Sequence, residues 1–267
     1  MNENEYKPKE ELYSDAYLGP KEQYLTKLKY LSRLAQHEIW DFSDTNDFRI
    51  LRNYISYTYE RVKEEDKISI AADKSSMCFN TGLLTKYEKD IFALFYPNKN
   101  ENRRPGQDWY LFGFKIKSDR EMSVFDSFPD VANYFIRAED FILQKGWDIC
   151  IDDEHIFEDN KDRFEAIGLD DEKLVVAYMN EAVRKIYERA KRNYKIAMPQ
   201  YYTNRSGESK IQLLLPLYLA NLEKPELALV VDKRNADYIG KTVLPLDWAY
   251  MNSRRILKPD VDWLRLE

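Results

Sequence analysis

Four short apolar segments near the C-terminus constrain the fold more than any other feature of the sequence. They are Ile196–Tyr202, Ile211–Leu219, Leu227–Asp232 and Lys241–Leu246, and short turns separate them, one with the letters NRSGES and one containing proline. A parallel pair of strands needs a crossover of a dozen or more residues, so connections this short join antiparallel neighbours. The segments therefore predict a mainly antiparallel sheet, and we expect an α+β fold with helices on one face of it.

Three further segments have the apolar periodicity of helices. The helical segments are Lys21–Trp40, about Asp47–Glu64 and Glu172–Lys195. Residues 1–20 are charged and end at Gly19-Pro20, which is typical of a loosely held arm. We therefore expect an N-terminal helical arm, residues 1–46, followed by a single α+β domain, residues 47–267.

The first half of that domain shows shorter signals. Ile68 and Ile70 alternate with polar neighbours, Met77–Phe79 is a second short apolar run, and Trp109–Lys117 has the composition of a strand. The segment Tyr87–Phe95 is interpreted as a short helix. The segment Asp119–Leu169 contains isolated aromatic residues without periodicity, and it receives no assignment.

Composition and charge restrict the class of protein. Hydrophobic residues make up 44% of the 267 residues, enough to bury a sizeable core. The N-terminus lacks the apolar stretch of a signal peptide, and no apolar run reaches the length of a spanning helix. We expect a cytoplasmic protein without a membrane partner. The net charge of −6 argues against a surface that is basic throughout, although it permits a local basic patch.

The sequence offers few ligands for a transition metal. The chain has 2 Cys and 2 His, and Cys78 and Cys150 are too far apart for a metal-binding motif. Any bound metal would need Asp and Glu oxygens, which suit Mg²⁺ or Mn²⁺. No metal site, cofactor or oligomeric state is assigned.

Cations on the helix Glu172–Lys195 have two interpretations. Arg184, Lys185, Lys191, Arg192 and Lys195 lie opposite an apolar face centred on Met179, which we expect to be buried together with Val183 and Ile186. The cations form either a solvated face or a stripe for a phosphate backbone. Glu181 and Glu188 interrupt the stripe.

The segment FNTGL, Phe79–Leu83, is interpreted as a turn that ends a strand. Asn80 and Gly82 tolerate positive φ, and Thr81 adds a hydroxyl group. The turn is either an ordinary connection or a site whose backbone N–H groups bind an anion. It is not a P-loop, because no Gly-Lys-Ser/Thr sequence follows.

Polar residues also interrupt the apolar segments near the C-terminus. Lys195, Gln200 and Tyr202 surround Pro199, and adjacent tyrosines on a strand point to opposite faces, so Tyr201 and Tyr202 cannot both be buried in the core. The exposed one is either packed at a sheet edge or available for base stacking. Gln212 opens an apolar run, so its amide is either a structural bridge or a ligand contact.

Asp247 is the carboxylate that we assign to catalysis, if catalysis occurs. It precedes a helical pattern that contains Asn252, Arg254 and Arg255. Its alternative roles are to cap that helix or to coordinate a metal or a hydroxyl group. Whether the chain is an enzyme stays open.

Several blocks together resemble a bacterial family of domains of unknown function, the one numbered 3825. They are FNTGL, NYKIAMPQYY, IQLLLPLYL, ALVVD and DWAYMNSRRILKPDVDWL, and the resemblance runs from about Arg52 to Leu264. Members of that family also occur joined to cold-shock-like or LOTUS-type winged-helix domains. The resemblance therefore implies a task related to RNA, but no activity and no catalytic residues.

We expect an RNA- or nucleotide-binding domain, with chemistry on phosphodiester or phosphoryl groups as an open possibility. The alternatives are a non-catalytic protein-interaction module in a larger assembly and a small-molecule enzyme. The binding hypothesis places seven residues around one pocket for a phosphorylated ligand: Asn80, Thr81, Gly82, Lys195, Gln200, Tyr202 and Gln212.

Overall fold

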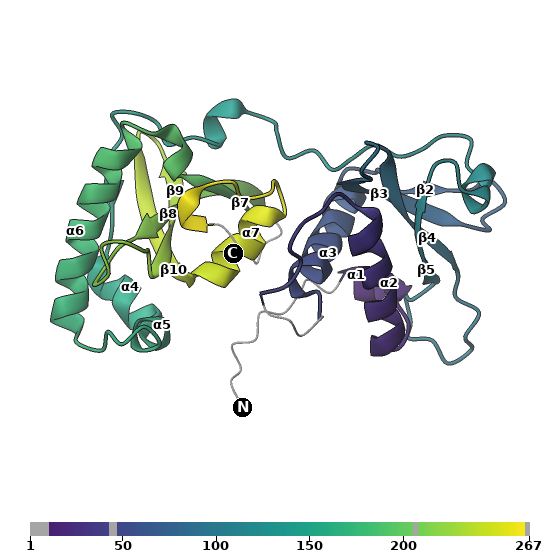
Figure 1. Ribbon diagram of the computed structural model, residues 1–267, viewed down its shortest axis with the longest axis horizontal. Coiled ribbons are helices and arrows are strands. Elements are labelled where there is room, and N and C mark those ends of the chain that lie inside the picture. The colour runs from purple at the N-terminus through teal and green to yellow at the C-terminus, as the bar shows by residue number, and fades with distance from the viewer. Residues whose placement is uncertain (1–10, 43–46, 205–207, 265–267) are drawn as a thin grey trace. The chain divides into compact units, whose positions relative to one another are not determined.

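The computed structural model describes residues 11–42, 47–204 and 208–264, and it divides the chain into two compact units. The first unit runs from Met1 to Asn133 and the second from Tyr134 to Glu267 (Figure 1). Each unit has its own five-stranded, mostly antiparallel sheet. The α+β class is therefore confirmed. The division into an arm of residues 1–46 and one domain of residues 47–267 differs from the two units observed, because the strands before residue 133 pair only among themselves.

The first unit packs helices against a sheet with the strand order β1-β5-β4-β3-β2. Strand β1 pairs with β5 in parallel, and the other pairs are antiparallel. Its elements are α1 (Glu11–Asp15), β1 (Ala16–Tyr17), α2 (Lys21–Leu34), α3 (Arg49–Glu64), β2 (Ser69–Ile70), β3 (Met77–Leu84), β4 (Asp90–Pro97), β5 (Trp109–Ile116) and the 3-10 helix η1 (Arg120–Val124).

The strand alternation in this unit gives both faces of the sheet an apolar layer. On one face, Phe79 of β3 packs edge-on against Tyr59 of α3. On the other face, Cys78 and Leu94 form a buried cluster with Met122 of η1. The helices expected at Lys21–Trp40 and Asp47–Glu64 are present as α2 and α3, and the strand expected at Trp109–Lys117 is β5.

Three expectations for this unit were wrong. Tyr87–Phe95 is not a helix, because its apolar part belongs to β4, where pairing with β3 and β5 outweighs local helical preference. The described part of the N-terminal arm is packed, since Leu12, Ala16 and Leu18 are buried. FNTGL lies within β3 and does not end it. The register shifts between Asn80 and Leu84, and the hairpin turn comes after the strand, at residues 85–89.

The second unit places a sheet between helices, with the strand order β6-β10-β9-β8-β7. Its elements are η2 (Ala138–Asp140), β6 (Ile149–Cys150), α4 (Asp153–Asp159), α5 (Lys161–Glu165), α6 (Glu172–Ala190), η3 (Tyr194–Ile196), β7 (Met198–Thr203), β8 (Ser209–Leu217), β9 (Leu227–Arg234), β10 (Asp237–Pro245), α7 (Leu246–Arg254) and η4 (Asp262–Leu264). Strands β7 to β10 form antiparallel pairs in sequence order, which confirms the sheet expected from the four apolar segments.

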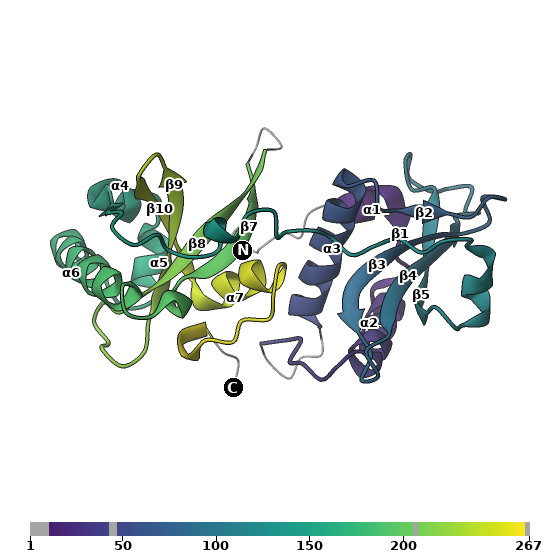
Figure 2. The same cartoon turned by 90° about the horizontal axis from the view of Figure 1, so that it is seen from above.

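Helices cover both faces of this sheet, not one (Figure 2). Met179, Val183 and Ile186 of α6 are buried, as expected, in a cluster with Leu213, Leu215 and Leu217 of β8. Helix α7 lies on the opposite face, against β7, β9 and β10. The sheet needs two helical layers because β8 and β9 are apolar on both faces.

We predict that Gly82→Ala destabilises the first unit, because Gly82 has φ +71° and an added Cβ would lie 2.8 Å from the Tyr54 hydroxyl. The left-handed conformation alone costs a residue with a Cβ about 1–2 kcal/mol. Denaturant unfolding of the full chain should show that loss of free energy of unfolding. Gly113→Ala is the matched control, since its added Cβ would meet no atom within 4 Å. Equal unfolding midpoints for the two variants would contradict the prediction.

Candidate functional site

Three polar side chains form a row across the second sheet, on the face that α7 covers. The strand register places Gln200 of β7 opposite Gln212 of β8. The Gln200 Nε2 donates to Gln212 Oε1 at 2.8 Å, and the Gln212 Nε2 donates to Asp232 Oδ1 of β9 at 2.8 Å. All three residues are buried. The row satisfies amide groups that would otherwise be desolvated without partners.

A cation is hydrogen-bonded at each end of this row, directly at one end and through an asparagine at the other. At one end, Lys210 Nζ donates to Asp232 Oδ2 at 2.7 Å. At the other, Asn252 Nδ2 of α7 donates to Gln200 Oε1 at 2.9 Å, and a guanidinium nitrogen of Arg255 donates to Asn252 Oδ1 at 2.7 Å. We call these six residues the polar chain: Lys210, Asp232, Gln212, Gln200, Asn252 and Arg255.

Arg255 is the most desolvated cation of the polar chain. Burial lowers the pKa of its guanidinium well below the usual range. Arg255 also donates to the backbone carbonyl of Tyr201 at 3.2 Å, and the neighbouring Ser253 hydroxyl donates to the carbonyl of Pro199 at 2.6 Å. These bonds join the C-terminal end of α7 to β7. They therefore fix the direction in which the chain leaves the helix.

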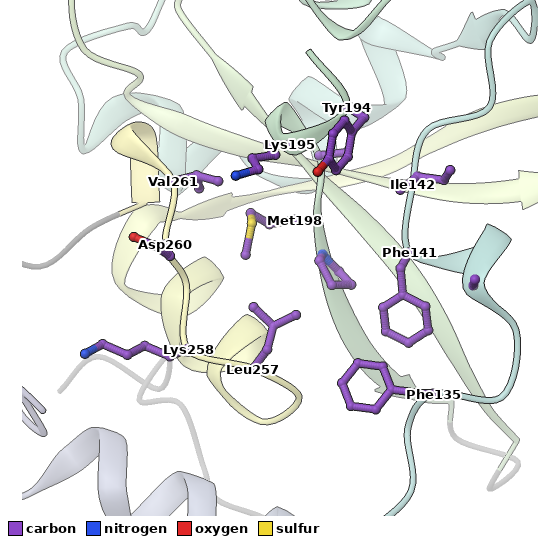
Figure 3. Close-up of a pocket in the computed structure, with 13 residues that line it drawn as sticks. Phe135, Phe141, Ile142, Tyr194, Lys195, Met198, Leu257, Lys258, Asp260 and Val261 are labelled. Carbon is purple, nitrogen blue, oxygen red and sulfur yellow. The ribbon is translucent and has the colours of Figure 1, made fainter. Parts of the chain in front are cut away.

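The segment that follows α7 forms one wall of a pocket of about 470 Å³. Figure 3 shows Leu257 and Asp260 on one side of this pocket, and Phe135 and Phe141 on the other. Met198 of β7 lies between the two walls. The pocket belongs entirely to the second unit.

The aromatic wall is partly open to solvent. The rings of Phe135 and Phe141 stack with centroids 5.2 Å apart and an interplanar angle of 30°. Phe135 is 62% exposed, and Tyr194, which lines the pocket from η3, is 64% exposed. Large aromatic side chains are normally buried, so three of them around one pocket suggest a surface for a flat, apolar ligand group.

The charged groups lie around this apolar interior. Lys195 lines the pocket from η3, while Lys258 and Asp260 line it from the segment after α7. In Figure 3, Lys258 extends away from the pocket centre. Within the described ranges, neither lysine ammonium has an ion-pair partner. The pocket thus combines an apolar interior with cations at its border.

The seven residues predicted to share a pocket are divided between the two units. Asn80, Thr81 and Gly82 belong to the first unit and the other four to the second. The Gly82 N–H donates to Asn80 Oδ1 at 2.9 Å, and the Leu83 N–H donates to Thr81 Oγ1 at 3.2 Å. These backbone donors stabilise the bulge in β3, and neither is directed to an anion.

Of the four residues in the second unit, only Lys195 lines the pocket. Gln200 and Gln212 belong to the polar chain, so the structural bridge is the better interpretation of the Gln212 amide. Tyr202 is 41% exposed and lies opposite Lys210 in the register, outside the pocket lining. Its neighbour Tyr201 is half-buried and packs edge-on against Tyr134.

Four of the five cations predicted to form the stripe are paired with carboxylates of α6. Arg184 and Lys185 contact Glu181, and Lys191 and Arg192 contact Glu188. Hydrogen bonds from Arg184 and Lys185 lower the pKa of Glu181 to about 2. The carboxylates therefore neutralise most of the positive charge of the predicted stripe. For the middle of the helix, a solvated face is the better interpretation.

Asp247 lies in the first turn of α7, where its carboxylate accepts from the Trp248 N–H at 2.9 Å. The N-cap position itself is Pro245. Asp247 does not line the pocket, which begins beyond the other end of α7. In the part of the chain that the structure describes, no group of three His, Cys, Asp or Glu is placed to bind a metal ion. The described helices also include none long and apolar enough to cross a membrane.

Sequence reasoning missed Phe135, Phe141, Tyr194 and Lys258. The two phenylalanines lie in the segment without periodicity, where they flank η2. Their spacing of six residues has no meaning for a regular helix or strand. The sequence contains one indication of them: aromatic residues that stand among charged ones are expected to be exposed. Without a structure, this indication is weak.

Comparison with known proteins gives one match. The model of a family described as "Domain of unknown function (DUF3825)" matches residues 31–263. It confirms the resemblance seen in the sequence and extends it towards the N-terminus, to all of α3 and the last four residues of α2. No curated protein and no solved structure matches the chain.

We predict that Gln212→Met destabilises the second unit, although the side-chain volume hardly changes. The variant leaves Gln200 Nε2 and Asp232 Oδ1 without their partners, and each unsatisfied buried group costs about 1–3 kcal/mol. Leu214→Met is the control, since Leu214 is buried on the same face of β8 and should lose less than about 1.5 kcal/mol. Denaturant unfolding measures both. A Gln212→Met loss no greater than that of the control would show that the polar chain does not stabilise the unit.

Proposed function

The chain belongs to the DUF3825 family, and we propose that its second unit binds RNA or a nucleotide in the pocket between η2, η3 and the segment after α7. The observation that carries the proposal is the stacked Phe135–Phe141 pair, with Phe135 exposed, in a pocket that Lys195 also lines. Aromatic faces bind bases of any sequence, and a lysine nearby supplies the charge that a phosphate needs.

The shape of the pocket supports a base in its interior and a phosphate at its border. A base has a flat apolar face, which matches the outer face of the stacked phenylalanine pair. Lys195 and Lys258 are the donors for a phosphate.

The proposal concerns binding and includes no catalytic step. Asp247, the carboxylate considered for catalysis, is outside the pocket lining. A hollow lined by stacked aromatic rings also favours a ligand-binding role over a flat protein-interaction module. With free cysteines at Cys78 and Cys150, we retain a cytoplasmic location as part of the proposal.

The test is fluorescence anisotropy of a labelled single-stranded RNA of roughly ten nucleotides, titrated with the full chain. Phe135→Ala should weaken binding roughly 5- to 150-fold, since stacking contributes about 1–3 kcal/mol per base. Lys195→Ala should weaken binding of all sequences and lower the slope of log K against log salt by about 0.7.

Two variants control for indirect effects. Ile136→Ala changes an exposed apolar neighbour of Phe135 that is not part of the lining, and Lys185→Ala removes a cation of α6 that is paired with Glu181. Both should bind like the unmodified chain. No binding by the unmodified chain, or equal losses in Phe135→Ala and Ile136→Ala, would contradict the proposal.

A further inference from the structure

We infer that the ligand is a single-stranded oligonucleotide that extends from the aromatic pocket into a second, cationic hollow beside it. This inference rests on the proposed function and names its substrate class. The second hollow has a volume of about 220 Å³ and lies between the end of α6 and the segment before β6. Its lining includes Lys145, Tyr187, Lys191, Arg192 and Tyr194.

Tyr194 lines both hollows, so they are neighbours on one surface of the second unit. Because its side chain is 64% exposed, a ligand crossing from one hollow to the other meets the tyrosine ring. In Figure 3 the ring of Tyr194 lies at the end of the pocket next to Ile142, away from Leu257. Consecutive aromatic contacts are how proteins bind consecutive bases of a single strand.

The charge of the second hollow suits a phosphate backbone. Three cations line it, and Glu188 is the carboxylate that pairs with two of them, Lys191 at 2.7 Å and Arg192 at 3.2 Å. Lys145 has no ion pair with any residue that the structure describes. Asp148 also acts on Lys191 and helps to raise the pKa of its ammonium, after the larger effect of the Glu188 hydrogen bond. Cations still outnumber these two carboxylates.

The ion pairs around Glu188 do not prevent phosphate binding. They are exposed pairs, which contribute about 1 kcal/mol or less and exchange readily with other anions. The C-terminal end of a helix disfavours an anion, and here Lys191 and Arg192 follow α6 directly and offset that effect. A mononucleotide that places its base on Phe135 and its phosphate at Lys195 leaves these cations unused. A single-stranded oligonucleotide has a phosphate at every nucleotide, so it can contact Lys195 and also the cations of the second hollow.

The inference predicts that affinity depends on ligand length. A nucleoside monophosphate, a nucleoside triphosphate and single-stranded RNAs of increasing length are titrated against the full chain. Affinity should rise at least roughly tenfold from the monophosphate to the longer RNAs and then level off. The double variant Lys145→Ala/Arg192→Ala should lose that gain, while its affinity for the monophosphate stays unchanged.

The matched control is Lys161→Ala/Arg184→Ala, which removes two exposed cations from α5 and α6 that line neither hollow. It should keep the full length dependence. Equal affinity for the monophosphate and all RNAs, or a triphosphate that binds as tightly as the longest RNA, would overturn the inference and leave the proposed function intact. Absence of binding by every ligand would instead overturn the proposed function.

Discussion

In the second unit, the packing of α7 on the sheet depends on one requirement, which is that buried polar groups need hydrogen-bond partners. Gln200, Gln212 and Asp232 lie side by side on three strands, under a helix, where they are almost fully shielded from water. Their bonds are complete only because Asn252 and Arg255 of α7 continue the chain on one side and Lys210 continues it on the other. A shift of α7 along the sheet would leave several of these groups unpaired, so the polar chain fixes both the position and the orientation of the helix.

The fixed position of α7 also determines where one wall of the pocket begins, because that wall is the backbone segment that follows the helix. The residues after Arg254 begin from a fixed point, and the Trp263 indole N–H bonds to the Ile196 carbonyl at 2.9 Å, which holds the far end of the same segment against η3. One wall of the pocket is therefore held at both ends by hydrogen bonds. A pre-organised wall lowers the entropy lost when a ligand binds, and it leaves the exposed aromatic residues to supply most of the adaptable contact.

The sequence was informative where a pattern is local and repeats. The apolar runs of the C-terminal strands with their short connections, and the apolar face of α6, were both predicted correctly, because each is a local pattern in the sequence. The tendency of Gly82 towards positive φ was also correct, yet it serves a bulge, since the strand continues through it to Leu84. Gln212 was noticed as an isolated amide, but only the register of three strands reveals Asp232 and Gln200 as its partners. Phe135 and Phe141 meet across an irregular segment, which no periodicity describes.

The central claim is that the aromatic residues around the pocket of the second unit contact nucleic-acid bases. Ultraviolet crosslinking of a uridine-containing single-stranded RNA to the full chain, followed by mass spectrometry of the peptides, tests it most directly. Crosslinking requires a base in contact with a side chain, so the account predicts adducts on Phe135, Phe141 or Tyr194. Adducts confined to the first unit, residues 1–133, or an absence of adducts under conditions where the RNA binds, would contradict it.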